Sequence, residues 1–214
     1  MFCIAGVCSS GVLSRGIVGS SAFESATPSS RTAERELSGL HIQRSLVAAL
    51  SRDDGKVVGV INKQHEYGRI IEIAGREIGV VEEGCQNCGA RVAGYLNYVG
   101  VETPAPWCAA WVSWVFGQAG YTQPKTAWSP ALFPKKRVVE IVAVEKGLVM
   151  GIYFPELKRI AHCGIVESLQ GDFVQTIEGN TNLAGGREGV GVFRKLRHKR
   201  SIAKYADWIR PVPP

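Results

Sequence analysis

Hydrophobic residues in the first half of the chain recur at helical spacing. Apolar side chains three to four residues apart predict helices over residues 34–51, 66–80 and 90–99. Residues 106–120, PWCAAWVSWVFGQAG, are apolar on nearly every side, which predicts a helix buried at the centre of the fold. Pro106 suits the first helical position, and Gly120 suits the end.

Beyond residue 120 the pattern changes to short β-like runs. The third and fourth runs are joined by the turn SLQGD, which predicts an antiparallel hairpin. Helices followed by strands are typical of an α+β fold, here with the N-terminal helices packed on an antiparallel sheet. The runs cover residues 138–144, 148–154, 160–168, 173–179 and 189–197.

The composition is that of an ordinary globular protein. The chain has 214 residues, 45% of them hydrophobic and 21% charged, which excludes collagen, a coiled coil and disorder throughout. No apolar run is long enough for a membrane-spanning helix. The net charge of +6 favours anionic partners without choosing among nucleic acid, wall polymer and lipid.

The first 33 residues differ from the rest in being rich in Ser, Gly and Ala. Their start is neutral and Arg15 interrupts a weakly apolar stretch, so they read either as a flexible leader or as a degraded export signal. We therefore expect a leader over residues 1–33 and one catalytic domain over residues 34–214. Export to the periplasm, the wall or the medium is suspected.

Cys85 and Cys88 form the only CxxC of the chain. A four-ligand zinc site needs a second ligand pair, and no second CxxC supplies it. We interpret the two as loop thiols that become oxidised if the chain is exported. No metal and no other cofactor is expected.

Cys108 lies in the first turn of the predicted apolar helix. Unpaired amides and the positive end of the helix dipole favour a thiolate there, and a thiolate is the nucleophilic form of cysteine. Position alone leaves two interpretations open: a catalytic nucleophile, or a buried cysteine that serves as a small hydrophobic residue.

His162 and Glu178 lie on neighbouring predicted strands. If the hairpin loop comprises residues 170–172, position 162 faces Asn180 and Glu178 lies diagonally adjacent on the same side. A change of register by one residue would separate them. Taken singly, His162 is interpreted as a core or edge histidine and Glu178 as a solvent-facing strand acid. Cys163, next to His162, is expected to point to the opposite face of the strand. A helix-start cysteine followed by a strand histidine and an acid or amide follows the order of papain-like thiol hydrolases.

Three stretches resemble the CHAP family of cysteine- and histidine-dependent amidohydrolases and peptidases. PWCAAWVSWVFGQAG is similar to its nucleophile helix, HCGIVES to its histidine strand and IEGNTN to its strand of orienting residues. The resemblance implies a papain-like fold with Cys108 as nucleophile, His162 as general base, Glu178 as orienting carboxylate and Asn180 as supporting amide.

The resemblance also implies a bacterial substrate, peptidoglycan or a muropeptide. The bond cleaved is then either the one between the muramyl sugar and L-alanine or one within the peptide. Trp107 and Trp128 are candidates for substrate binding. The alternatives are an amidase of a small peptide conjugate and a catalytically silent wall-binding module. Nucleic acid is not an expected partner, because the basic residues cluster only near the C-terminus.

Overall fold

The computed structural model describes residues 54–183 and 189–211, with side chains from residue 63 onwards. The expected leader, residues 1–33, and the expected helix over residues 34–51 lie outside the described residues. Asp53–Pro214 form one compact unit. No helix in the described part of the chain is both long and apolar enough to cross a bilayer.

Among the described residues, three α-helices precede the sheet: α2 (Asp54–Arg76), α3 (Ala90–Tyr98) and α4 (Cys108–Gln118). Helix α2 ends four residues before the predicted position 80, because the chain after it pairs with the edge of the sheet through the Val81–Gly191 bridge. Helix α4 begins two residues after Pro106, so Cys108 itself is the first helical residue.

The strands form a single six-stranded sheet in the order β1-β6-β2-β3-β4-β5, with every pair antiparallel. This arrangement confirms the α+β fold class. The strands are β1 (Val138–Val139), β2 (Val149–Phe154), β3 (Arg159–Gln170), β4 (Phe173–Thr181), β5 (Gly191–His198) and β6 (Lys204–Ala206).

The predicted strand over residues 138–144 is wrong for most of its length. It pairs with β6 only at Val138 and Val139, and residues 141–143 form a 3-10 turn. Strand β6, which the sequence did not predict, has only three residues and also pairs with β2. There is therefore no partner to extend β1, and Val142 is 92% exposed.

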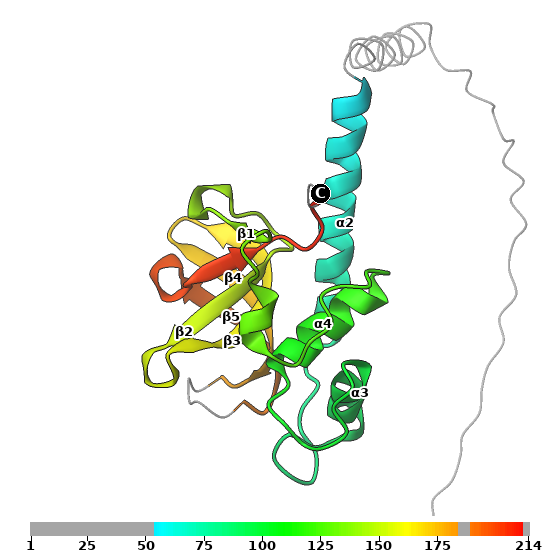
Figure 1. Ribbon diagram of the computed structural model, residues 1–214, viewed down its shortest axis with the longest axis vertical. Helices are drawn as coiled ribbons and strands as arrows, with labels where there is room; N and C mark the ends of the chain where they lie inside the picture. The colour runs from blue at the N-terminus through cyan, green and yellow to red at the C-terminus, as the bar shows by residue number, and fades with distance from the viewer. Residues whose placement is uncertain (1–53, 184–188, 212–214) are drawn as a thin grey trace, which may run out of the picture. The chain divides into compact units, whose positions relative to one another are not determined.

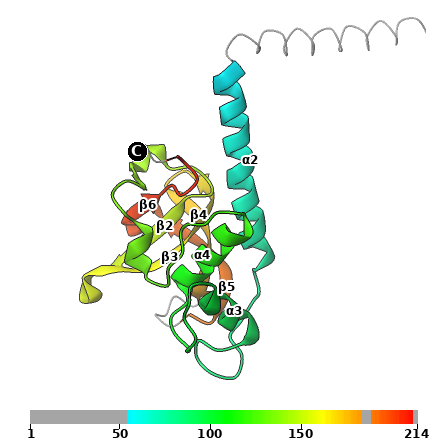
Figure 2. The same ribbon diagram turned by 45° about the vertical axis from the view of Figure 1, so that its right-hand side comes forward.

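Helix α4 packs against β3 and β4, and α3 and α2 pack against α4, so the helices gather beside the sheet (Figures 1 and 2). Trp111, Val115 and Phe116 are completely buried in this layer. Burial of a side chain such as Phe116 contributes roughly 1.5–3 kcal/mol relative to exposure. The close approach requires Gly179, where a Cβ would lie 2.7 Å from Cγ of Trp111.

The β3–β4 hairpin differs from the predicted one at its turn but recovers the predicted register. The turn has two residues, with Gln170 opposite Phe173, rather than the expected pairing of Leu169 with Phe173. A bulge at Glu167 then shifts the pairing by one residue, so that Ile165 lies opposite Ile177. The two departures cancel, and His162 and Glu178 lie on one face of the sheet.

Candidate active site

Cys108 opens α4 and is 5% exposed. Its Sγ lies 3.4 Å from Oγ of Ser129, in the 3-10 turn Ser129–Leu132. A hydrogen bond from the Cys163 thiol does most to hold the pKa of Cys108 well below its usual value; burial opposes this effect, and His162 and Ser129 add to it. The N-terminal end of the helix favours the thiolate in the same direction.

Cys163 is more than a core residue. It points to the α4 side of the sheet, as expected from the period of two, and is fully buried. Burial raises the pKa of Cys163 well above its usual value, and its contact with Cys108 raises the pKa further. Of the two neighbouring thiols, Cys108 therefore carries the negative charge.

His162 lies on β3 with its side chain 12% exposed. Its Nε2 is 2.8 Å from Oε2 of Glu178, which leaves Nδ1 as the ring nitrogen for the interaction with Cys108. Burial alone would lower the pKa of His162, but hydrogen bonds with Cys108 and Glu178 outweigh it and raise the pKa to about 9. The site thus favours a thiolate–imidazolium pair.

Glu178 is fully buried on β4 and accepts hydrogen bonds from several directions. Nε of Arg197 donates to Oε1 at 2.8 Å and Nη2 donates to Oε2 at 2.5 Å. The hydroxyl of Thr176 donates to Oε1 at 2.6 Å. Burial would raise the pKa of Glu178, but the hydrogen bonds from Arg197 and His162 hold it well below the usual range. Glu178 is therefore a carboxylate.

Arg197, which belongs to the basic cluster near the C-terminus, is a site residue that the sequence did not predict. Its side chain is 25% exposed and forms a two-point ion pair with Glu178. The alternation of side chains along β5 could have indicated this role, because Lys195 and Arg197 share one face of the strand. The pairing of Lys195 with Thr176 puts that face on the same side of the sheet as Glu178.

Asn180 is near this group but does not contact His162. Its φ of 52° and the irregular β4–β5 register between Glu178 and Thr181 turn its side chain away from the histidine. The amide oxygen accepts from the backbone N–H of Trp107 at 2.9 Å, and the amide nitrogen donates to the carbonyl of Gly189 at 3.3 Å. Asn180 thus holds the residue before Cys108.

The two candidate tryptophans have different surroundings. Trp107 is fully buried and stacks on Tyr95, with ring centroids 5.5 Å apart, so its ring cannot form part of an open groove. Trp128 is 53% exposed, and the guanidinium carbon of Arg159 lies 4.2 Å from the centroid of its ring. Trp107 therefore belongs to the core, although it is next to Cys108 in sequence.

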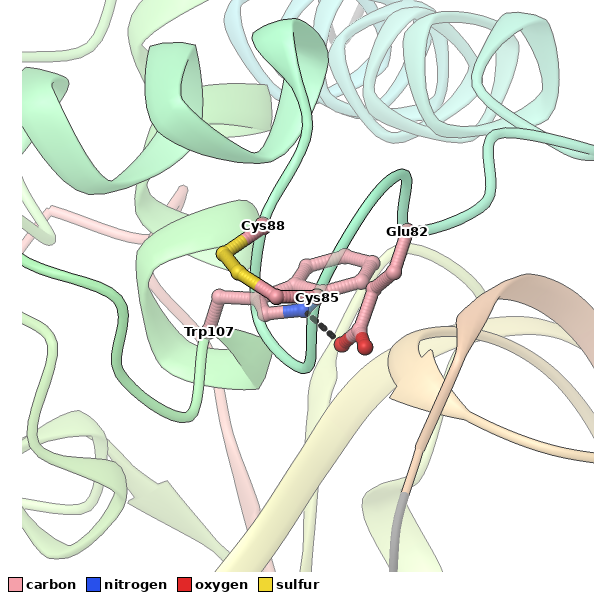
Figure 3. The surroundings of a disulfide bond; sticks show 4 residues. All are labelled: Glu82, Cys85, Cys88 and Trp107. Atoms are coloured by element: carbon pink, nitrogen blue, oxygen red, sulfur yellow. Dashed lines mark hydrogen bonds between the residues drawn. A yellow bond between two sulfur atoms is a disulfide. The ribbon is translucent and has the colours of Figure 1, made fainter.

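The CxxC forms a disulfide close to Trp107. Cys85 and Cys88 are joined, and their loop carries Glu82, whose Oε1 accepts the indole N–H of Trp107 at 2.8 Å (Figure 3). Trp107, the residue before Cys108, is therefore bound through its backbone N–H by Asn180 and through its indole N–H by Glu82. Among the described residues no group of three His, Cys, Asp or Glu side chains is placed to hold a metal ion.

Cys108 and His162 open onto a cleft of about 360 Å³. Strand pairing puts Ile152 opposite His162 and Phe154 opposite Arg159, so the cleft follows one face of the sheet, opposite to the face that carries Cys163. The lining includes apolar side chains from β2 and its hairpin, and polar ones from β4 and β5: Pro106, Cys108, Ile152, Phe154, Leu157, Arg159, Ala161, His162, Asn180, Thr181, Asn182, Gly189, Lys195 and Arg197.

Comparisons with known proteins find a likeness in structure but none in sequence. No protein-family model matches the chain, and no curated protein matches it in sequence. Among solved structures, the P60 domain of antigen MAP1204 from M. avium subspecies paratuberculosis aligns with a TM-score of 0.45 and 13% sequence identity. The alignment covers 70% of this chain and 99% of that domain.

The ion pair beneath the site gives a stability prediction. Arg197→Met leaves a buried carboxylate without its main partner, which we expect to cost roughly 3 kcal/mol of the free energy of unfolding at neutral pH. Because the pKa of Glu178 is lowered in the folded protein, its ionised form adds to the free energy of unfolding. This stabilisation is fully present above the unfolded-state pKa of about 4.3 and is lost as the pH falls through the folded-state pKa. In urea unfolding, the difference in the free energy of unfolding between Arg197→Met and the parent should therefore be smaller in acid than at neutral pH.

Arg194 provides the matched control for this measurement. It lies on the same strand and forms a comparable ion pair with Glu167, but its side chain is 52% exposed. Arg194→Met should change the free energy of unfolding by less than about 1 kcal/mol, because exposed pairs contribute little. Equal effects of the two substitutions would contradict the assignment of a buried charge to Glu178.

Thiol reactivity tests the charge assignment between Cys108 and Cys163. At about pH 6, iodoacetamide should alkylate Cys108, which has a depressed pKa and lines the cleft, and should leave Cys163 unmodified. Mass mapping of the modified peptides reads out the result. Cys163 should also stay unmodified in the Cys108→Ala variant, and preferential labelling of Cys163 in the parent would reverse the assignment.

Proposed function

We propose that this protein is a cysteine amidohydrolase or peptidase that cleaves an amide bond of bacterial cell-wall peptidoglycan. The observation that carries the proposal is the arrangement of three groups: Cys108 at the start of α4, His162 beside it, and buried Glu178 on the second ring nitrogen. Its neighbours hold the pKa of Cys108 well below its usual value. This is the arrangement of nucleophile, base and orienting group that thiol hydrolases require. The cell-wall substrate follows from the resemblance of three stretches to the CHAP family.

The first half of the reaction forms a thioester. The Cys108 thiolate attacks the amide carbonyl carbon, and the carbonyl π electrons move to the oxygen. Backbone N–H groups in the first turn of α4, which have no partners within the helix, bind that oxyanion. His162, protonated at Nδ1, gives its proton to the leaving amine as the C–N bond breaks. The products are an acyl-enzyme at Sγ and a free amine.

The second half of the reaction returns the enzyme. Neutral His162 takes a proton from water, whose oxygen attacks the thioester carbon, and collapse of the intermediate expels the Cys108 thiolate. Throughout, Glu178 accepts the Nε2–H hydrogen bond and stabilises the imidazolium. Arg197 and Thr176 keep Glu178 ionised and in place.

Asn180 does not contact the reacting groups in this mechanism and acts through Trp107 instead. By accepting the backbone N–H of Trp107, it positions the first turn of α4 rather than the imidazole. Trp128, at the side of the cleft where Arg159 lies, is the exposed aromatic residue proposed to contact substrate. Action on the wall implies export, which the Cys85–Cys88 disulfide supports, since disulfides persist in oxidising compartments.

Removal of the nucleophile tests the proposal directly. Cys108→Ala and Cys108→Ser should each abolish release of fragments from purified peptidoglycan, while the circular dichroism spectrum stays that of the parent. Mass analysis of the fragments identifies the bond: new amino-sugar ends indicate an amidase, and new peptide termini an endopeptidase. Persistent cleavage by either variant would refute the thiol mechanism.

The division of labour between Glu178 and Asn180 gives a prediction on pH dependence. Activity of the parent should fall as the pH rises through about 9, the pKa of His162, because the imidazolium that protonates the leaving amine is lost. Glu178→Gln removes a charge that raises this pKa, so the alkaline limb of kcat/KM should move to lower pH, with a loss of about 10- to 100-fold.

Asn180→Ala is the comparison for Glu178→Gln. Because its amide contacts Trp107 and Gly189, this change should lower kcat/KM less and leave the alkaline limb in place. Native circular dichroism of both variants is the control for folding. A larger loss in Asn180→Ala, with a shifted alkaline limb, would make Asn180 the orienting residue instead.

A further inference from the structure

The cleft has an excess of positive charge that the reaction does not use. Its lining residues include Arg159, Lys195 and Arg197 but no aspartate or glutamate. Arg197 is neutralised by Glu178 beneath it, and the His162 imidazolium is neutralised by the Cys108 thiolate. Arg159 and Lys195 thus remain as two uncompensated cations on the walls of the cleft.

Neither of these two side chains has a carboxylate partner in the part of the chain that the structure describes. Lys195 Nζ donates to the carbonyl of Asn182 at 2.6 Å. Arg159 Nη1 donates to the carbonyl of Ile160 at 3.1 Å, and its guanidinium lies over the ring of Trp128. These contacts hold the side chains in place without cancelling their charge, so both retain donors for an anion.

Strand pairing explains how both cations come to line the same cleft. Arg159 begins β3 opposite Phe154, and Lys195 lies on β5 opposite Thr176. Both share the sheet face of His162, and both line the cleft together with His162 and Cys108. Apolar Ile152, Phe154 and Leu157 line the same cleft and suit an aliphatic part of the ligand.

We infer that the cleft selects a peptide with a free carboxylate near the scissile amide, and that Lys195 and Arg159 bind that carboxylate. The inference rests on the proposed function, since it names the chemical class of substrate for the same site. An anion placed there gains charge-assisted hydrogen bonds in a partly buried setting, whereas a neutral carboxamide offers only ordinary ones.

The test uses two synthetic muramyl peptides that differ only in one acidic side chain, present as a carboxylate or as a carboxamide. The parent should have a kcat/KM about 10- to 100-fold higher for the carboxylate peptide. In Lys195→Met and Arg159→Met the ratio of kcat/KM between the two peptides should fall towards one, whereas Lys195→Arg, which keeps the charge, should retain the ratio of the parent. Arg194→Met, a cation removed from the same strand but outside the cleft, should keep the ratio of the parent.

Binding to the Cys108→Ser variant, measured by calorimetry with the same two peptides, separates this inference from the proposed function. The inference is supported if the carboxylate peptide binds more tightly than the carboxamide peptide and Lys195→Met abolishes that difference. This holds even if the parent hydrolyses neither peptide, because the absence of hydrolysis would refute only the proposed function. Equal affinity for the two peptides, no binding of either, or a preference that survives both Lys195→Met and Arg159→Met would overturn the inference.

Discussion

The site depends on a buried carboxylate whose charge is compensated. Glu178 has no exposed surface, and an isolated carboxylate there would take up a proton rather than stay ionised. The two-point ion pair with Arg197 and the hydroxyl of Thr176 reverse that outcome. Because Glu178 stays charged, His162 holds a proton, and because His162 holds a proton, the neighbouring thiol of Cys108 can lose one. The ionisation of these groups forms a single coupled system.

Backbone irregularities bring this system together. The bulge at Glu167 corrects the register of the hairpin, and the irregularity after Glu178 turns Asn180 towards Trp107 instead of His162. Gly179, within the second of these irregularities, lets α4 approach the sheet closely enough for Cys108 to reach the edge of the cleft. Bulges are common beside active sites because they redirect individual side chains without ending a sheet.

The sequence predicted the elements better than their ends. The apolar helix and the β3–β4 hairpin were identified because hydrophobic periodicity is local, and the proximity of Glu178 to His162 followed from register. The burial of Trp107 and the two-residue strand at residue 138 were missed because tertiary contacts decide both. Arg197 was missed because its role depends on Glu178, a buried acid on the neighbouring strand β4 that is distant from it in sequence.

The order of these parts along the chain has a consequence for biosynthesis. Helix α4 emerges from the ribosome before β3, β4 and β5, which carry His162, Glu178 and Arg197. A nascent chain that ends after α4 therefore lacks the partners that depress the pKa of Cys108, and its thiol is far less nucleophilic. The thiolate is therefore favoured only after β3, which carries His162 and Cys163, has packed against α4.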